Sequence, residues 1–323
     1  MSTALVTGVA GFVGSTLAEA LLARSEQVVG VDCYTPYYER AAKEANLAAC
    51  RAHPRFRLEE LDLRSAELEP LLDGVDVVYH QAAQPGVRLS WSTGFAEYTG
   101  HNVLATQRLL EAATRVGVPR VVYASSSSVY GQAASYPTTE DDLPKPHSPY
   151  GVTKLAAEHL CNLYAANWGL STVSLRYFTV YGPRQRPDMA IHRLVTAGLA
   201  GVAFPLFGDG SAVRDFTYVD DAVRANLAAA DADIAPGTVM NIAGGAEISM
   251  VELLDLAGRH IGRPVLIDQR DPQPGDVART GGTITRARSL AGWEPRVDLE
   301  TGMAATVAWF RDRIADPDYG EAS

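Results

Sequence analysis

Tyr150 and Lys154 are the two side chains whose type and spacing most directly suggest acid–base chemistry. Because they are four residues apart, they would lie one turn apart on the same face of a helix. A phenol with an ordinary pKa near 10 is a poor base at neutral pH, and lowering that pKa by about three units requires roughly 4 kcal/mol in favour of the phenolate. A neighbouring lysine ammonium contributes to that stabilisation. The pair therefore predicts a base that removes a proton from a hydroxyl group, and the serine run 125–128 offers a hydroxyl that could share this proton.

A glycine-rich turn near the N-terminus predicts a dinucleotide site. Gly8, Gly11 and Gly14 lie between the first strand-like segment and the first helical one. Glycine suits a tight turn where the backbone approaches a pyrophosphate, and the following helix offers free N–H groups to the phosphates. Asp32 ends the second strand-like segment, where a carboxylate accepts from ribose hydroxyls and repels a 2′-phosphate, so we predict NAD rather than NADP. Asp62 ends the third such segment, where both an adenine contact and a helix cap are open interpretations.

Strand-like apolar runs alternate with helical patterns through the first half of the chain. Helical periodicity covers residues 12–24, 103–116 and 150–168, and the last of these segments carries Tyr150 and Lys154. The apolar runs are near-continuous in Val, Leu, Ile and Tyr, which is typical of parallel strands buried on both faces. They span residues 4–7, 28–32, 56–61, 75–79, 121–124 and 173–177. This alternation predicts an α/β fold with a doubly wound, Rossmann-like parallel sheet.

The pattern changes after Tyr177. The segments expected there are a loop at 181–187, a helix near 188–200, a strand at 202–207 with a turn at 208–210, and a strand at 239–243 that returns to the sheet. Asp220 or Asp221 is expected to cap a helix that runs to Ala229. From residue 248 a helical segment leads into a proline-rich stretch. We therefore expect an NAD-binding domain of residues 1–178, with 214–245 returning to it, and a smaller α/β substrate lobe of residues 179–213 and 246–323.

Composition argues against several other classes of protein. The 323 residues carry a formal net charge of −10, which disfavours a nucleic-acid-binding surface and requires local arginines or backbone amides to hold an anionic ligand. Three cysteines at irregular spacing and scattered histidines predict neither a disulfide framework nor a metal site. No apolar run reaches the roughly 20 residues that span a membrane. Because a strand-like segment follows Met1 almost directly, we expect no signal peptide and a cytoplasmic location.

Taken together, these motifs resemble the extended short-chain dehydrogenase/reductase family, in its nucleotide-sugar epimerase/dehydratase branch. The resemblance covers nearly the whole chain, and it rests on the glycine turn, His80-Gln81-Ala82-Ala83, Tyr98-x-x-x-Asn102, residues 125–131, Tyr150 with Lys154, residues 175–183 and Arg214-Asp215-Phe216. It implies that Ser126 and Tyr150 carry the proton, that Lys154 holds the nicotinamide ribose, and that Arg214 grips a nucleotide diphosphate. The residues that it implies for cofactor binding are Gly8, Gly11, Phe12, Val13, Gly14, Asp32, Asp62, Leu63, Ala82, Asn102, Tyr150, Lys154 and Tyr177.

A few positions distinguish the reactions of this branch. Its dehydratases carry an Asp–Glu pair where this chain has Ser127 and Ser128, and UDP-glucuronate decarboxylases have a glutamate at the position of Ser128. Both reactions are therefore disfavoured, and we expect these two serines to contact the substrate. Residues 84–88 and 179–190 are similar to UDP-glucuronate 4-epimerases. Gln81 departs from the leucine usual at its position, and we have no functional interpretation of it from the sequence.

The resemblance implies NAD-dependent epimerisation at C4 of a UDP-sugar, with UDP-glucuronate to UDP-galacturonate as the expected reaction. Tyr150, as phenolate, takes the proton of the C4 hydroxyl with the help of Ser126. Hydride passes from C4 to NAD+ and returns to the other face of the transient 4-keto sugar. NAD is regenerated in every turnover, so we expect it to stay tightly bound.

The 4-keto form of a glucuronate is a β-keto acid, which loses CO2 readily unless its carboxylate is held. Arg186, with its bidentate fork, and Thr179 are the contacts we expect for that carboxylate. Arg88 and Arg184 are competitors, and Arg186 could instead be a surface arginine on a proline-rich loop.

Three other functions stay open at this point. A UDP-glucose/UDP-galactose 4-epimerase would need no cation opposite C6, a UDP-glucuronate decarboxylase would release a pentose nucleotide, and a non-catalytic NAD-binding sensor would need no base. The presence of Tyr150, Lys154 and Ser126 argues against the sensor. By the resemblance, we also expect a homodimer that pairs through the helices at 103–116 and 150–168.

Overall fold

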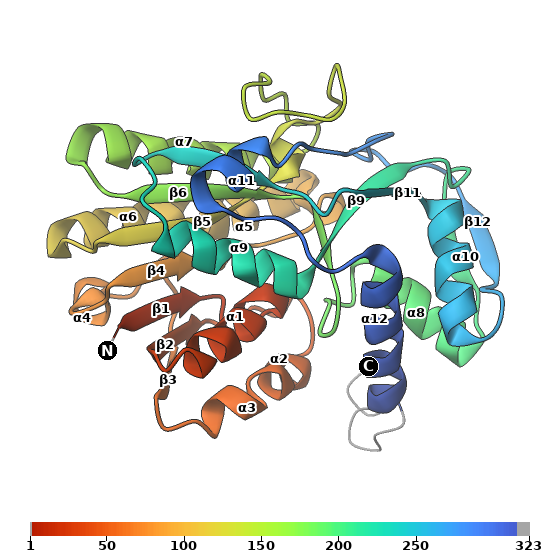
Figure 1. Cartoon of the computed structure of the whole chain (residues 1–323), viewed down its shortest axis with the longest axis horizontal. Helices are drawn as coiled ribbons and strands as arrows, with labels where there is room; N and C mark the ends of the chain where they lie inside the picture. The colour runs from red at the N-terminus through yellow and green to blue at the C-terminus, as the bar shows by residue number, and fades with distance from the viewer. Residues whose placement is uncertain (1, 315–323) are drawn as a thin grey trace.

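The computed structural model describes residues 2–314, and a parallel sheet of seven strands forms its centre (Figure 1). The strand order is β10-β6-β5-β4-β1-β2-β3, so the chain winds outward from β1 first in one direction and then in the other. In sheets of this type, ligands bind at the carboxyl ends of the strands where the winding reverses. The strands are β1 (Thr3–Thr7), β2 (Gln27–Asp32), β3 (Phe56–Glu60), β4 (Val77–His80), β5 (Arg120–Ser126), β6 (Thr172–Tyr177) and β10 (Thr238–Ile242). The predicted Rossmann-like sheet is confirmed.

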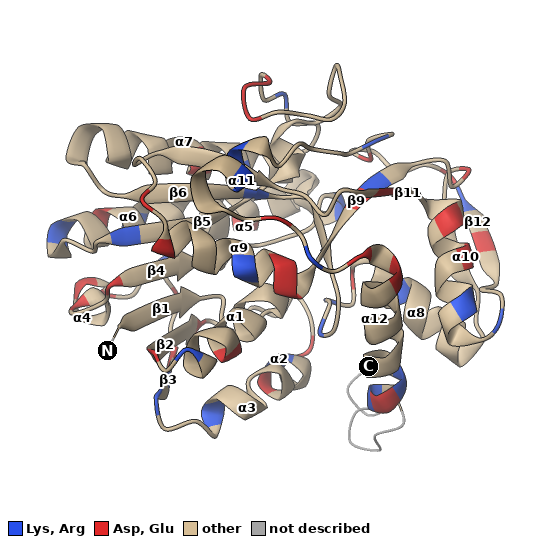
Figure 2. Ribbon diagram, in the orientation of Figure 1, with Lys and Arg blue, Asp and Glu red and all other residues tan. Residues whose placement is uncertain are grey.

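Helices cover both faces of this sheet. Successive residues of β1 face opposite layers, because Ala4 and Val6 pack into one hydrophobic core and Leu5 packs into the other. The first layer contains α1 (Phe12–Ala23), α3 (Ala48–Arg51), α9 (Val219–Asp231) and α11 (Thr285–Ala291). The second contains α4 (Glu69–Leu72), α6 (Ala105–Val116) and α7 (Pro149–Trp168). Figure 2 shows charged residues mainly on helices and loops, whereas the central strands β1 and β4 carry none.

A smaller lobe lies beyond the carboxyl ends of the strands, at the right of Figure 1. As far as residue 314, it contains two small sheets, in the orders β11-β9-β7 and β12-β8, and three helices. The elements are β7 (Thr179–Tyr181), α8 (Ala190–Ala200), β8 (Phe204–Phe207), β9 (Val213–Tyr218), β11 (Ala246–Ser249), α10 (Met250–Ile261), β12 (Ile267–Arg270) and α12 (Leu299–Ile314). Leu194, Leu253 and Phe310 are fully buried in its core, which extends onto Phe12 of α1.

Two segments lie on the other side of the domain boundary from where the sequence analysis puts them. β9 pairs with β7 and β11 instead of joining the large sheet. Conversely, α11 packs on α9 and β10, so it belongs with the layers of that sheet. In the domain division that we propose, β9 belongs to the substrate lobe and α11 to the NAD-binding domain.

The predicted cap of α9 is wrong. The helix follows Tyr218 without a side-chain cap, and Asp220 and Asp221 both lie in its first turn. Asp221 is fully buried, and its carboxylate accepts hydrogen bonds from the backbone N–H groups of Arg296 and Val297, each at 3.0 Å. Its carboxylate therefore ties α9 to the segment before α12, which no local capping pattern indicates.

Other predicted boundaries differ by a few residues. The helix predicted from residue 103 begins at Ala105, because a π-helical turn (Thr99–Leu104) precedes it. A short α-helix (Phe95–Tyr98) comes before that turn. The short strand β7 was not predicted, and β8 begins two residues later than predicted. Between residues 2 and 314, no helix is both long and apolar enough to cross a membrane.

Candidate active site

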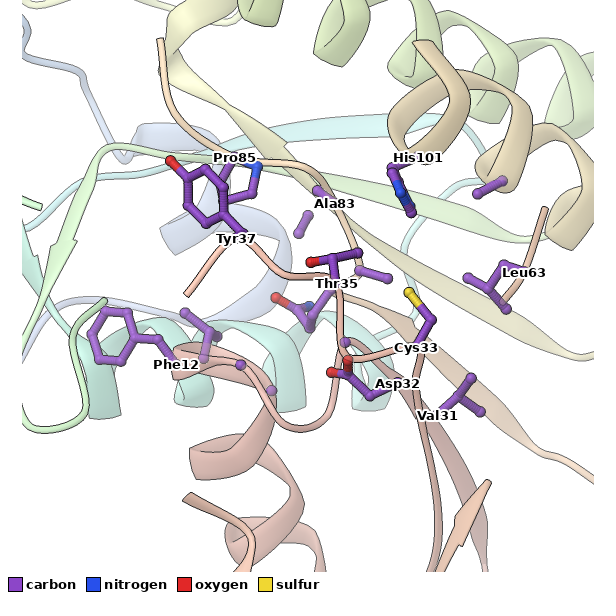
Figure 3. A pocket seen from close by; sticks show the side chains of 18 of the residues that line it. Phe12, Val31, Asp32, Cys33, Thr35, Tyr37, Leu63, Ala83, Pro85 and His101 are labelled. Atoms are coloured by element: carbon purple, nitrogen blue, oxygen red, sulfur yellow. The ribbon is translucent and has the colours of Figure 1, made fainter. Parts of the chain in front are cut away.

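A cleft runs along the carboxyl ends of β1, β2, β4, β5 and β6, where the predicted cofactor and catalytic residues meet. Figure 3 shows one part of it, with Asp32, Cys33 and Thr35 along the segment that follows β2 and Tyr37 beside Pro85. The residues of the sequence analysis that line this cleft are Gly8, Gly11, Phe12, Val13, Gly14, Asp32, Asp62, Leu63, Ala82, Tyr150, Lys154, Tyr177 and Arg186.

The glycine turn has no space for side chains. Gly8 has φ +67°, and a methyl group added to it would lie 2.7 Å from the Cα atom of Ala82. A methyl group on Gly14 would lie 2.2 Å from the carbonyl oxygen of Gly8, so the helix packs directly on the turn. The residue before α1, Gly11, provides no side-chain cap, which leaves N–H groups of the first helical turn for another acceptor. This cradle fits a pyrophosphate, as the sequence analysis predicts for a dinucleotide.

The carboxylate of Asp32 is held in place by the backbone on both sides of it. One oxygen accepts a hydrogen bond from the N–H of Ala10 at 3.0 Å and the other accepts from the N–H of Tyr34 at 2.9 Å. The first bond connects the end of β2 to the glycine turn. Each oxygen keeps a free lone pair, so the carboxylate can still accept from ribose hydroxyls.

Asp62 lines the cleft, but its carboxylate is already hydrogen-bonded to a neighbouring arginine. Arg64 donates to it from Nε and Nη2, at 3.0 and 2.8 Å, and also from its backbone N–H at 2.8 Å. These hydrogen bonds lower the pKa of Asp62. The carboxylate therefore stabilises the turn after β3, although no helix begins there for it to cap. Cys33 and His101 place their ligand atoms within 4.8 Å of Asp62, but its ion pair with Arg64 leaves this cluster without a free carboxylate for a metal ion.

Tyr150 and Lys154 lie in the first turns of α7, which has a strong start. Pro149 occupies its first position, and the hydroxyl of Ser148 accepts a hydrogen bond from the N–H of Gly151 at 3.1 Å. The ring of Tyr150 meets that of Tyr98 edge-on, with ring centres 6.1 Å apart. Burial raises the pKa of Tyr150 above that of an ordinary phenol, although Ser126 and the charge of Arg186 act to lower it. Ser126 is therefore the serine whose hydroxyl acts on the phenol.

Burial strongly affects the Lys154 ammonium. Only 3% of the residue is exposed, and burial lowers its pKa to about 7, while the charge of Glu158, one turn further along α7, acts to raise it. The ammonium nitrogen lies 4.7 Å from the ring centre of Tyr123, in a cation–π contact. A hydrogen-bonding partner for this ammonium is expected from the ligand side, because Lys154 lines the cleft.

Ser125, next to Ser126, has a structural task. Its hydroxyl donates to Glu158 at 2.6 Å, and Arg176 donates to the same carboxylate from Nε at 3.0 Å and from Nη2 at 2.6 Å. All three residues are buried. This network joins β5, β6 and α7 directly behind the catalytic residues, so it fixes the position of Ser126 relative to Tyr150.

Asn102 is not among the residues that line the cleft. Its side-chain oxygen accepts from the N–H of Gln84 at 2.7 Å, and its amide donates to the carbonyl oxygen of Gln84 at 3.0 Å and to Thr153 at 2.9 Å. Tyr98 donates to the carbonyl oxygens of Pro85 and Gly86. The Tyr98-x-x-x-Asn102 motif therefore holds the loop after β4 in place. The resemblance implies a direct cofactor contact for Asn102, but this residue does not line the cleft.

The four candidate arginines of the substrate site have different surroundings. Arg186 lines the cleft and pairs with Asp188, with an Nε–Oδ1 distance of 3.0 Å. Arg184 turns away and pairs with Glu19 of α1 at 2.8 Å, so it is not available to a ligand of the cleft. Arg88 lies 4.1 Å over the ring of Phe207 and pairs with Asp276 at 3.0 Å, and both partners lie in the substrate lobe.

Arg214 is half-buried on β9, and its only hydrogen bonds within residues 2–314 go to backbone carbonyl oxygens, among them that of Val213 at 2.9 Å. Burial lowers its pKa, and the charge of Arg88 acts in the same direction. Ser127 and Ser128 lie in a 3-10 turn (Ser127–Val129) after β5, and Thr179 begins β7; all three are half-buried. Neither these three residues nor Ser126 are among the residues that line the cleft, although Ser125 is.

Sequence reasoning missed several residues of the site. Lys43 of the short helix α2 (Arg40–Asn46) is only 4% exposed and lines the cleft, where its Nζ donates to the carbonyl oxygen of Thr35 at 2.5 Å. Tyr37 and Tyr38 line the cleft from the loop after β2, and the buried hydroxyl of Tyr38 has no hydrogen-bond partner among the described residues. Sequence reasoning also missed Arg193 of α8, whose charge and that of Arg88 act on each other. The only signal in the sequence is a loop rich in tyrosine directly after Asp32.

Comparisons with known proteins agree with this geometry. The model of the NAD dependent epimerase/dehydratase family matches residues 4–243. An uncharacterised UDP-glucose epimerase of Bacillus subtilis, YtcB, is 40% identical over 306 residues, which cover 94% of this chain and 96% of that protein. A UDP-glucuronate 4-epimerase of Thermodesulfobacterium geofontis is 35% identical over 318 residues, with 96% of each chain covered. The crystal structure of UDP-glucuronic acid 4-epimerase from Bacillus cereus in complex with UDP-glucuronic acid and NAD matches with a TM-score of 0.93 and 40% identity, over 96% of this chain and 99% of that one. The chain is therefore a member of the NAD dependent epimerase/dehydratase family.

Proposed function

We propose that this NAD-dependent epimerase inverts C4 of UDP-glucuronate to give UDP-galacturonate. The observation that carries the proposal is the position of Arg186, whose guanidinium lines the same cleft as Tyr150 and acts on the charge of that phenol. A cation there can hold a carboxylate on the sugar that reacts at Tyr150. Ser126 is the last residue of β5, and the two residues that follow it are serines. The chain therefore lacks the acid–base pair of a dehydratase at these two positions.

NAD, when bound in the cleft, accepts a hydride from the sugar carbon and returns it. The protein supplies the proton transfer: Tyr150 removes the proton of the C4 hydroxyl, and Ser126, whose hydroxyl acts to lower the pKa of the phenol, shares it. Lys154 supplies a positive charge that stabilises the phenolate. The cradle of backbone around Gly8 and the fixed carboxylate of Asp32 support tight retention of the cofactor throughout the cycle.

Asp188 holds Arg186 by one edge and leaves the other edge of the guanidinium free. Its two oxygens accept from Nε and Nη2 of the arginine, at 3.0 and 3.1 Å. The five N–H groups of an arginine form a planar fork, so Nη1 and the second N–H of Nη2 stay available to a substrate carboxylate. Holding the carboxylate in this way keeps the C5–C6 bond of the 4-keto intermediate out of alignment with the carbonyl, which opposes decarboxylation. Thr179, Ser127 and Ser128 are proposed to complete this contact.

The nucleotide diphosphate is proposed to lie between Arg88 and Arg214. The charges of these two arginines act on each other, and each lies near Asp276. A diphosphate would relieve this repulsion and provide acceptors for both guanidinium groups. Such local positive charge is needed because the net charge of the chain is −10.

Replacement of Arg186 by alanine tests the substrate. A charge-assisted hydrogen bond contributes about 1.5–3 kcal/mol, so Arg186→Ala should lower kcat/KM for UDP-glucuronate by about 10- to 100-fold. It should also raise the release of CO2. Turnover of UDP-glucose should fall less than turnover of UDP-glucuronate, because only the charge of the arginine beside the phenol is lost for a sugar without a carboxylate. Arg184→Ala, which removes an arginine paired with Glu19, serves as the matched control and should behave as the parent. Parental turnover of UDP-glucuronate by Arg186→Ala, without extra CO2, would remove the arginine from this role.

UDP-glucose is the second candidate substrate, because YtcB is described as a UDP-glucose epimerase. The two candidates separate in one experiment, in which the purified protein, without added NAD, receives either UDP-glucose or UDP-glucuronate and the products are resolved by chromatography. Our proposal requires faster formation of UDP-galacturonate than of UDP-galactose. The reverse order would replace it with the second candidate, and a pentose nucleotide as product would indicate a decarboxylase.

We further propose that two copies of the chain pair through α6 and α7. Apolar side chains are exposed on these adjacent helices, among them Leu104 just before α6 and Val152 and Leu163 of α7, which are 48%, 49% and 55% exposed. Val152 and Leu163 are three helical turns apart and therefore lie on the same side of α7. A second copy would cover this surface symmetrically. Because nucleotide sugars and NAD are soluble metabolites and the three cysteines are free, we also propose a cytoplasmic location.

Light scattering coupled to gel filtration tests the dimer. The parent should elute with twice the mass of the chain, and Leu163→Glu should elute as a monomer, since a carboxylate would be buried at the centre of the interface. Val202→Glu introduces the same change at an exposed valine outside α6 and α7, and should leave the mass unchanged. A parent that has the mass of one chain at micromolar concentration would contradict the proposal.

A further inference from the structure

We propose that Gln81 and Asn226 are positioning residues, which fix the phenol of Tyr177 as a wall of the cleft beside the reacting groups. The three side chains come from three distant parts of the chain: the residue after β4, the interior of α9, and the end of β6. Gln81 is also the residue for which the sequence offered no function. The inference rests on the proposed function, because it concerns the same NAD-dependent reaction.

The three side chains form a closed ring of hydrogen bonds. The amide of Asn226 donates to the hydroxyl of Tyr177 at 2.6 Å, this hydroxyl donates to the side-chain oxygen of Gln81 at 3.2 Å, and the amide of Gln81 donates to the side-chain oxygen of Asn226 at 2.9 Å. Each residue thus donates once and accepts once within the ring. The second N–H of the Asn226 amide donates to the carbonyl oxygen of Ala222 at 2.8 Å, inside the same helix.

The direction of the ring is determined by its chemistry. The Asn226 amide points an N–H at the phenolic oxygen, so the single proton of that hydroxyl must go to an acceptor elsewhere. Gln81 provides this acceptor, and a leucine at its position would provide none. Without it, the phenol would keep an unpaired proton next to the cleft, or rotate to direct that proton at the ligand. The glutamine therefore decides which surface Tyr177 presents.

The ring lies between the two ends of the cleft. The backbone N–H of Gln81 donates to the carbonyl oxygen of Thr7 at 3.2 Å, directly before the glycine turn, and its backbone lies against Gly8. Tyr177 is the parallel-strand partner of Ser126, and its ring packs against the cores of both the large sheet and the small lobe. Both Gln81 and Tyr177 line the cleft together with Tyr150 and Lys154. The ring of hydrogen bonds among Gln81, Asn226 and Tyr177 therefore connects the phosphate-binding turn rigidly to the wall beside Ser126.

This wall has a specific consequence for a reaction that moves hydride in both directions. The sugar must turn over between the two hydride transfers, whereas the nicotinamide must stay in place, so its position has to be set by the protein. A phenol whose hydroxyl is fully used in the ring presents its apolar face and edge, and offers no polar group that could follow the turning sugar. A nicotinamide bound in the cleft would pack on this wall, and the hydrogen-bonded ring would position it without acting on the substrate.

The test is Gln81→Leu, with Gln107→Leu as matched control. Gln107 also donates from its side-chain amide to a tyrosine hydroxyl, that of Tyr164 at 2.9 Å, but it lies outside the cleft. For each protein, we would measure the fraction of chains that retain NAD after gel filtration, the dissociation constant for NAD, kcat and KM. Gln81→Leu should weaken NAD binding by about tenfold and lower kcat by about tenfold, with KM for the UDP-sugar changed by less than about threefold. The control should retain parental values.

Tyr177→Phe and the double variant make the test independent of one substitution. If the ring acts as a unit, Tyr177→Phe should weaken NAD binding to a similar extent, and the double variant should be no worse than either single variant. Independent losses that multiply in the double variant, or parental NAD binding in both single variants, would overturn the inference. Should Gln81→Leu fail to fold, Tyr177→Phe decides alone. NAD retention does not depend on which sugar is the substrate, so a ring effect without UDP-glucuronate turnover would refute the proposed function and leave the ring intact.

Discussion

Tyr150→Phe is expected to lower kcat by about 10³-fold or more, with little change in folding or in the retention of NAD. The phenyl ring has nearly the volume of the phenol and can keep the edge-on contact with Tyr98, so the cleft should stay intact. The substitution removes the base that we propose for the C4 hydroxyl, and general base catalysis contributes about 10²–10⁴-fold. Ser126 cannot replace it, because a serine hydroxyl without a base beside it is not a proton acceptor at neutral pH.

The expected loss can be separated from loss of binding. Tyr150→Phe should bind UDP-glucuronate with an affinity within about tenfold of the parent in a calorimetric titration, while epimer formation over hours is barely detectable. Tyr164→Phe is the control, since Tyr164 lies on the same helix and its hydroxyl donates to Glu111 instead of facing the cleft. A Tyr150→Phe protein that interconverts its UDP-sugars at the parental rate would refute the mechanism as a whole.

The central sheet was predictable because each of its strands has a local signature. Strands that are buried on both faces must be apolar along their whole length, and the intervening helices show their own period. The strand β9 was not predicted, and residues 214–245 were expected as a whole to return to the NAD-binding domain, because no local pattern tells which strand a segment pairs with. The predicted cap of α9 was wrong for a related reason. Asp221 is a good capping residue by type, yet its hydrogen-bond partners lie 75 and 76 residues further along the chain.

The residues of the site also divide into those that the sequence could predict and those that it could not. The glycine turn and the Tyr150/Lys154 pair were predictable because their chemistry needs a fixed spacing within one turn or one helix. Lys43 and Gln81 were not, because their function depends on contacts that only the folded chain creates; Gln81 and Asn226 are 145 residues apart. The choice between Arg184 and Arg186 was also beyond the sequence. Two residues in an irregular loop can point in opposite directions, and only the structure tells which one faces the cleft.

Lys154→Met is the second substitution with a large expected effect, and its signature is a change in the pH dependence of kcat. Burial lowers the pKa of Lys154 to about 7 in the chain without ligand, and Glu158 acts to raise it. The ammonium must be charged to stabilise the phenolate of Tyr150. As pH rises through the pKa of Lys154, that charge is lost, so the parent should lose activity on the alkaline side. A bound ligand that accepts a hydrogen bond from the ammonium would move this limb to higher pH without changing its direction.

Methionine fills nearly the same buried volume and carries no charge. Burial raises the pKa of Tyr150, with Ser126 and Arg186 acting to lower it, so loss of the neighbouring ammonium should leave little phenolate at neutral pH. We therefore expect Lys154→Met to lower kcat by about 10²–10³-fold at pH 7. Its residual rate should still be rising at about pH 10, because burial raises the pKa of this phenol above its ordinary value, whereas the rate of the parent falls in this range. Lys154→Arg keeps the charge at every pH of the experiment, and should lack the alkaline limb altogether. A Lys154→Met profile that keeps the alkaline limb of the parent would assign that limb to another group and leave the phenolate without its proposed stabiliser.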